Sequence, residues 1–153
     1  MNDTLQKAID DLNYLIAVNS ARIDQYHSAE EKVENKNLQT LFQRMDAESN
    51  SHITRLAALI QDHGGEVEKG TTLSGDLHRI WLDVKSALTG NDSKAILTAL
   101  ECAERSTLDA YNRILESGYD LPEEDLAIIR QQRQLVEDAH AAIERLGEEP
   151  VAK

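Results

Sequence analysis

The chain has 153 residues, the length of one ordinary domain, and 28 acidic against 16 basic residues give it a formal net charge of −12. Nucleic acids and anionic membranes are held mainly through clustered Lys and Arg, so this charge argues against both partners. Aromatic residues make up only 4% of the sequence, and Leu, Ala and Ile recur at helical spacing without a long alternating β-branched run. The sequence therefore predicts a single all-α domain over 1–147, followed by a short tail, 148–153.

Targeting and redox signals are sparse. The first residues are polar and amphipathic, so we expect no signal peptide. No stretch approaches the ~20 apolar residues of a membrane span. Cys102 is the single cysteine, which excludes an internal disulfide and a Cys-x-x-Cys zinc pair, and we expect its thiol to be buried and inert. These features predict a cytoplasmic protein.

Apolar residues at spacings of three and four predict four long helices and one short helix. Asn35 or Asn37 can cap the second helix, Gly64 and Gly65 end it, and Pro122 opens the last one. The predicted helices span about 3–34, 38–63, 75–88, 93–116 and 122–147.

The lengths of the connections predict how these helices run. Short links make 3–34 antiparallel to 38–63, and 93–116 antiparallel to 122–147. The long connection 66–92 can place 38–63 and 93–116 parallel to each other. This is the connectivity of a ferritin-like four-helix bundle, which is the fold that we predict.

Acidic and histidine residues interrupt the apolar stripes near the middle of these helices. A carboxylate in a core stripe requires a hydrogen bond, an ion pair or a metal ion. At 1.5 Å per residue from the predicted loop, Glu101 lies opposite roughly His140, and Glu104 lies opposite the region of Glu137. If 38–63 and 93–116 run parallel, Glu48 and His52 lie within about a turn of the level of Glu101 and Glu104. The candidate metal ligands are Glu48, His52, Glu101, Glu104, Glu137 and His140.

This candidate set follows the pattern of carboxylate-bridged two-metal bundles, which use a carboxylate from each of two helices and a Glu-x-x-His pair from each of the other two. Residues 137–140 form such a pair, and carboxylates with imidazole suit one or two iron or manganese ions. Activity would then be redox chemistry with dioxygen or peroxide. Two departures count against a full two-metal site: Glu48 and His52 are four residues apart, and Asp24 is a marginal seventh ligand from 3–34.

The same residues allow an interpretation without metal. His52 and His140 can be core histidines that are hydrogen-bonded by Glu48 and Glu101. The protein would then be a non-enzymatic structural or stress-response bundle that acts as a homodimer or through a protein partner. No residue is assigned a catalytic role, and no nucleophile-elbow glycine pattern supports a hydrolase.

The segment His78-Arg79-Ile80-Trp81 resembles the His-Arg-x-Trp segment of a bacterial family called domain of unknown function 2383, whose members are ferritin-like four-helix bundles. Further matching positions are Leu12-Asn13, Tyr26 with Ala29, Glu104 with Tyr111, Leu121-Pro122, Gln132 and His140. The resemblance implies a ferritin-like fold without an established activity, stress-associated relatives, and metal binding suspected from the fold. We expect Arg79 to stack on Trp81 or to pair with a carboxylate at the edge of the core, which would fix the short helix to the bundle.

Overall fold

The computed structural model describes residues 3–90, 92–116 and 121–148. These residues form five α-helices and no strand, which confirms the all-α prediction. Each helix end lies within two residues of its predicted position. The predicted loop between 93–116 and 122–147 falls mostly outside the described residues, as does the tail beyond Glu148. The helices are α1 (Asp3–Lys32), α2 (Lys36–Asp62), α3 (Gly75–Thr89), α4 (Ser93–Leu115) and α5 (Glu123–Glu148).

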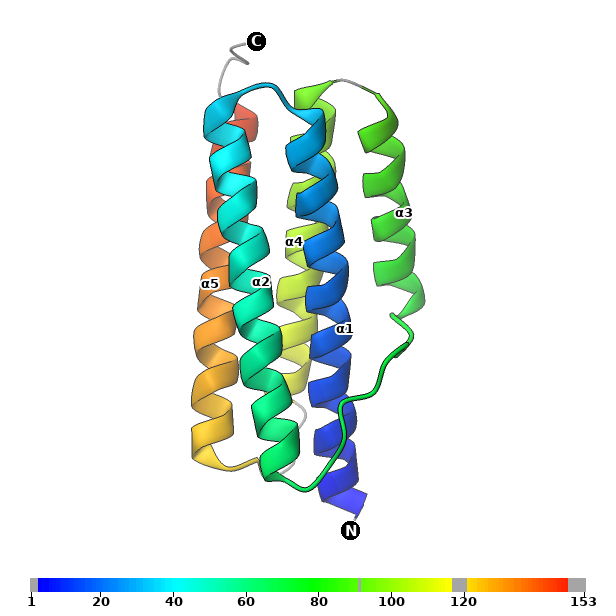
Figure 1. Ribbon diagram of the computed structural model, residues 1–153, viewed down its shortest axis with the longest axis vertical. Coiled ribbons are helices and arrows are strands. Elements are labelled where there is room, and N and C mark those ends of the chain that lie inside the picture. Colours follow the sequence, from blue (N-terminus) through cyan, green and yellow to red (C-terminus); the bar gives the residue numbers. More distant parts are fainter. Residues whose placement is uncertain (1–2, 91, 117–120, 149–153) are drawn as a thin grey trace.

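The four long helices lie side by side, and α3 packs on the outside against α4 and α1 (Figure 1). The helices α1 and α2 form one antiparallel pair, and α4 and α5 form the other. The connection after α2 crosses α1, and α3 then returns the chain to the end of the bundle where α2 began. As a result α2 and α4 run in the same direction, as the long connection predicted.

Three side chains satisfy backbone N–H groups at helix starts. Asn35, and not Asn37, caps α2, because its Oδ1 accepts hydrogen bonds from the backbone N–H of Asn37 at 2.8 Å and of Leu38 at 3.1 Å. Ser74 caps α3 and Asp92 caps α4 in the same way. Each cap satisfies donors that a helix cannot pair internally.

Two glycines allow the chain to leave α2. Gly64 has a φ of 77°, a left-handed conformation that glycine adopts at little cost. At Gly65 the backbone packs so closely on Ile9 that an added Cβ would lie 2.7 Å from the Ile9 Cδ1 atom. The connection therefore starts tight against α1.

The core consists of two apolar clusters, one towards each end of the bundle. Most buried polar residues of the long helices, including Arg22, His52 and Glu104, lie between the two clusters along their helices. None of the helices in the described residues has the length and apolar character needed to cross a bilayer. The first cluster includes Tyr26, Phe42, Met45, Leu100 and Ile143, and the second includes Leu12, Leu15, Leu56, Tyr111 and Ile129.

Two local expectations are wrong. Arg79 is exposed and pairs with Asp76 on its own helix, and it is Lys85 whose Nζ lies 4.3 Å from the centre of the Trp81 ring. Both cations on α3 thus stay within reach of water instead of entering the bundle. Cys102 is exposed, because it lies on the face of α4 that is turned away from the core.

Candidate functional site

The buried polar layer is centred on Arg22, a residue of α1 that is only 1% exposed. Its guanidinium grips Glu104 of α4 with two hydrogen bonds: Nε donates to Oε1 at 2.9 Å and Nη2 donates to Oε2 at 2.8 Å. Glu104 is also 1% exposed. This two-point geometry is the strongest arrangement available to an arginine and a carboxylate. Arg22 therefore supplies the positive charge that balances the buried carboxylate of Glu104.

The second carboxylate near Arg22 belongs to Glu48 of α2. The Arg22 Nη1 lies 3.0 Å from Glu48 Oε1 and donates to the Ser49 hydroxyl at 3.2 Å. Burial raises the pKa of Glu48, and the charge of Arg22 opposes that shift. Burial also acts to lower the pKa of Arg22, but the charge of Glu104 reverses the effect and the net shift is upward. The guanidinium therefore remains a permanent cation between two acids.

A chain of neutral hydrogen bonds continues the layer beside Arg22. Asn19 donates from Nδ2 to the Tyr111 hydroxyl at 2.9 Å, and this hydroxyl donates to Gln132 Oε1 at 2.8 Å. Gln132 Nε2 donates to the backbone carbonyl of His52 at 3.3 Å. The contacts of Arg22 and this chain together join all four long helices at one level. Such a network holds the helices in register, because a slip would leave buried polar groups unpaired.

His52 is a buried neutral member of this layer. Its Nδ1 lies 3.2 Å from Asn19 Oδ1, a distance at which a protonated Nδ1 donates a hydrogen bond. Burial lowers the pKa of His52 to about 3, and the positive charges of Arg22 and Arg55 act in the same direction. Its Nε2 is buried and finds no hydrogen-bond partner among the described residues. An imidazole in this setting has no need of a carboxylate partner.

A second group of acids and histidine lies between α4 and α5. Glu101, His140 and Glu144 each place a ligand atom within 4.8 Å of the other two. His140 Nε2 lies 3.6 Å from Glu101 Oε1, is buried, and forms no hydrogen bond with a described residue. Arg105, an exposed residue one turn along α4, also pairs with Glu101. This group has two acids and one imidazole, and the cation that pairs with it, Arg105, is exposed.

The structure thus divides the six predicted ligands among three environments. Glu101 and His140 meet each other, as their levels along the helices predicted. Glu137 pairs with Arg133 at 3.0 Å on the outer side of α5. The marginal seventh candidate, Asp24, is exposed on α1. The remaining three, Glu48, His52 and Glu104, belong to the Arg22 layer.

The fit to a two-metal centre can be tested on this geometry. Such a centre places two cations between carboxylates of the four helices. Here a guanidinium lies between Glu48 and Glu104, and a metal ion in the same space would meet its positive charge at short range. As the side chains lie, the Arg22 layer does not fit a metal pair. The carboxylate and imidazole group on α4 and α5 has no such competing cation inside it.

Two residues of these sites were not predicted. Arg22 is three residues after Asn19 and four before Tyr26, both of which lie on the predicted inner stripe of α1, so the spacing was a usable signal. Glu144 is four residues after His140 and therefore lies on the same face of α5.

These features define a helical bundle with a charge-compensated polar layer in its core and a separate carboxylate and imidazole group. The sequence profile described as domain of unknown function 2383 matches residues 7–117, and the chain belongs to this family. The match contains the residues of the Arg22 layer on α1, α2 and α4, and it stops before α5. Comparison with curated proteins and with solved structures found no match.

Proposed function

We propose that this protein is a ferritin-like helical bundle that binds one iron or manganese ion through Glu101, His140 and Glu144, and that it acts in stress or redox protection in the cytoplasm. The observation that carries the proposal is the convergence of three ligand atoms within 4.8 Å. The buried Nε2 of His140 supports it, because an imidazole nitrogen without a hydrogen-bond partner is available to a metal ion.

The types of ligand favour iron or manganese. Two carboxylates offer hard oxygen atoms and His140 adds one borderline nitrogen, a set used for these ions. Glu101 and His140 are each about one-sixth exposed, with side-chain exposures of 17%, and Glu144 is exposed. An ion can thus enter from solvent and keep water or a small oxidant as a further ligand. Iron or manganese bound here would supply one-electron chemistry towards dioxygen or peroxide.

Arg105 competes with a metal ion for the carboxylate of Glu101. Its guanidinium pairs with one oxygen of Glu101 and is 57% exposed, so water screens the pair and little energy is lost when it opens. Arg105 pairs with Oε1 of Glu101, the oxygen that also lies 3.6 Å from His140 Nε2, so a metal ion must share that oxygen with Arg105, displace Arg105 or bind the other oxygen. Arg105 therefore weakens a metal ion's hold without blocking it, in contrast to Arg22 in the core.

A second candidate function rests on the Arg22 layer. Its ion pairs and hydrogen bonds satisfy most of the buried polar groups without metal, which supports a non-enzymatic structural or stress-response bundle. Such a bundle would act as a homodimer or through a protein partner. The two-metal centre of all six predicted ligands also remains a prediction, and it requires Arg22 to leave the space between Glu48 and Glu104.

Metal counting separates these three alternatives. Protein expressed in medium supplemented with iron and manganese, and purified without an affinity tag or chelator, is analysed for its metal content. We expect about one ion per chain in the wild type, and near none in His140→Ala or Glu144→Gln. The matched control Glu148→Gln removes a similar exposed charge one turn further along α5 and should keep the ion.

Two other metal contents would contradict the one-ion proposal. About two ions per chain, the content of a two-metal bundle, would replace the one-ion proposal with the centre of six ligands. A content near zero that anaerobic loading with ferrous iron and with manganous ion does not raise would overturn metal binding and leave the metal-free bundle.

A further inference from the structure

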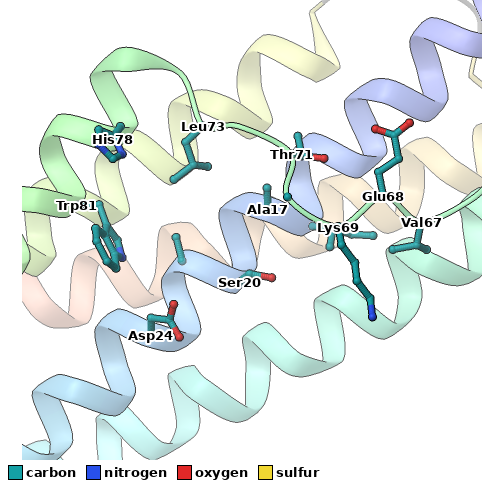
Figure 2. Close-up of a pocket in the computed structure, with 13 residues that line it drawn as sticks. Ala17, Ser20, Asp24, Val67, Glu68, Lys69, Thr71, Leu73, His78 and Trp81 are labelled. Atoms are coloured by element: carbon teal, nitrogen blue, oxygen red, sulfur yellow. The ribbon is translucent and has the colours of Figure 1, made fainter.

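A groove of about 460 Å³ lies between α1, α3 and the connection that joins α2 to α3. Ile16, Ala17 and Ala21 of α1 form apolar lining, and Leu73 and Trp81 add to it from the opposite side. Figure 2 shows how the connection and α3 border the groove above α1. The groove exists because α3 is short and packs only along one half of α1. Its size is that of a pocket for a small organic molecule.

The polar groups of the groove are unevenly distributed. In Figure 2, Asp24 and Trp81 lie at one end, and Glu68 and Lys69 lie at the other. The exposed Asp24 carboxylate forms no ion pair or hydrogen bond with a described residue, whereas Glu48 on α2 is paired with Arg22. Thr71 also lines the groove, and its hydroxyl is buried without a partner among the described residues. The groove thus has an unpaired carboxylate and an indole ring among its lining, towards the same end.

A carboxylate next to an indole ring favours a cation. The faces of the ring attract positive charge, and Lys85 Nζ, 4.3 Å from the ring centre, occupies one of them, which leaves the other face for a ligand cation. Asp24 adds a full negative charge at the same end of the groove. The net charge of −12 attracts cations and repels anions over a longer range. The apolar lining, in turn, requires a ligand with an apolar body.

We propose that this groove binds a small organic cation with a flat apolar body, whose charged end lies between Asp24 and Trp81. This site is independent of the metal site, since it shares no residue with Glu101, His140 or Glu144. A compact ligand fits better than an extended peptide, because the connection crosses α1 and closes one end of the groove.

Trp81 is the only tryptophan, so its indole N–H gives a single resonance in a ¹⁵N-correlated NMR spectrum that reports on the groove. The full chain is titrated with benzamidine, benzamide and benzoate, which share a flat ring and carry a positive, zero and negative charge. We expect benzamidine to shift the Trp81 resonance with saturation, benzamide to bind more weakly, and benzoate to bind least. This order follows from the charge at Asp24 and not from the apolar lining, which is common to all three.

Two pairs of variants test the geometry. Asp24→Asn should weaken benzamidine about threefold to tenfold, the effect of losing one net hydrogen bond at an exposed site, and leave benzamide unchanged. The control Asp109→Asn removes an exposed acid of α4 outside the groove and should change neither. Ala17→Leu fills the groove and should abolish the binding of both probes, and Ala47→Leu, at an exposed position of α2, should not.

Three results would overturn the proposal. The first is a Trp81 resonance that does not respond with saturation to millimolar benzamidine. The second is benzoate binding as tightly as benzamidine, or Asp24→Asn behaving like Asp109→Asn. The third is a dimer in sedimentation experiments that Ala17→Leu dissociates, since a second copy of the chain would then occupy the groove.

Discussion

The buried layer around Arg22 and the group of Glu101, His140 and Glu144 contain the same kinds of side chain but differ in the charge that balances them. In the layer, a buried guanidinium lies on Glu104 and Glu48. Between α4 and α5, the acids and imidazole face one another, and the arginine that pairs with Glu101 is exposed. An acid that already has a buried cation serves the fold, whereas acids that converge without one remain available to a ligand. Burial of a carboxylate is therefore a poor guide to metal binding until the charge that balances it is known.

The largest effect is expected from Arg22→Met. This change keeps most of the side-chain volume but leaves Glu104 buried without its cation, which should lower the free energy of unfolding by about 3–5 kcal/mol. Urea unfolding at pH 7 measures the loss. The control Arg105→Met breaks the exposed pair with Glu101 and should cost at most about 1 kcal/mol.

A double change sharpens this prediction. Arg22→Met combined with Glu104→Leu removes both charges, and it should recover much of the stability that Arg22→Met loses. Equal effects of Arg22→Met and Arg105→Met would contradict the distinction between the two regions.

Metal addition should have the next largest effect. At a free manganous ion concentration of 100 times the dissociation constant, binding to the folded state alone stabilises by about 2.7 kcal/mol. Thermal unfolding with and without the ion measures this gain. His140→Ala should abolish the gain, and Glu104→Gln, although it destabilises the protein, should keep it. Loss of the gain in Glu104→Gln but not in His140→Ala would place the ion in the core instead.

His52 predicts how stability depends on pH. Its folded pKa is about 3 and lies below the usual value of 6.5, so the unfolded chain binds a proton in this interval that the folded protein does not. Stability should therefore fall as the pH drops below about 6.5, by up to about 1.4 kcal/mol per pH unit from this residue. His52→Asn should reduce the slope between pH 6 and 4 in urea unfolding. An unchanged slope would mean that His52 is protonated inside the folded protein.

A further test of the Arg22 layer is the change Tyr111→Phe. The change removes a hydroxyl that links Asn19 to Gln132, and it leaves both amides with an unmet hydrogen bond. A loss of about 1–3 kcal/mol is typical of such buried groups. The control Tyr14→Phe removes a half-buried hydroxyl that accepts only one backbone hydrogen bond, from Ser74, and it should cost less.

Much of the architecture could be predicted because it depends on local rules. Apolar spacing located all five helices. Asn35 and Gly64 marked the start and the end of α2, as the structure has them. Helix rise alone placed Glu101 opposite His140. The resemblance carried by the short helix led to the family whose profile matches residues 7–117.

Site chemistry was harder to predict for a physical reason. A long arginine side chain can extend to solvent or turn inward, and only the carboxylates on other helices decide which. Arg22 was therefore missed although its spacing fits the inner stripe, and Glu104 was left with several candidate partners. Glu144 was missed for a related reason: only the residues that lie next to it in the folded pair α4 and α5 show whether an exposed acid can take part in a site.

By itself, then, the sequence determined the helices, their pairing and the level at which polar groups enter the core, because backbone hydrogen bonding and apolar spacing act within each segment. Only the tertiary structure decided which polar groups meet. That choice depends on contacts between residues 82 positions apart, as for Arg22 and Glu104, and on the balance between desolvation and ion pairing at one point of the interior. The same packing leaves the groove over α1 open, because the length of α3 matters there only once it lies against the bundle.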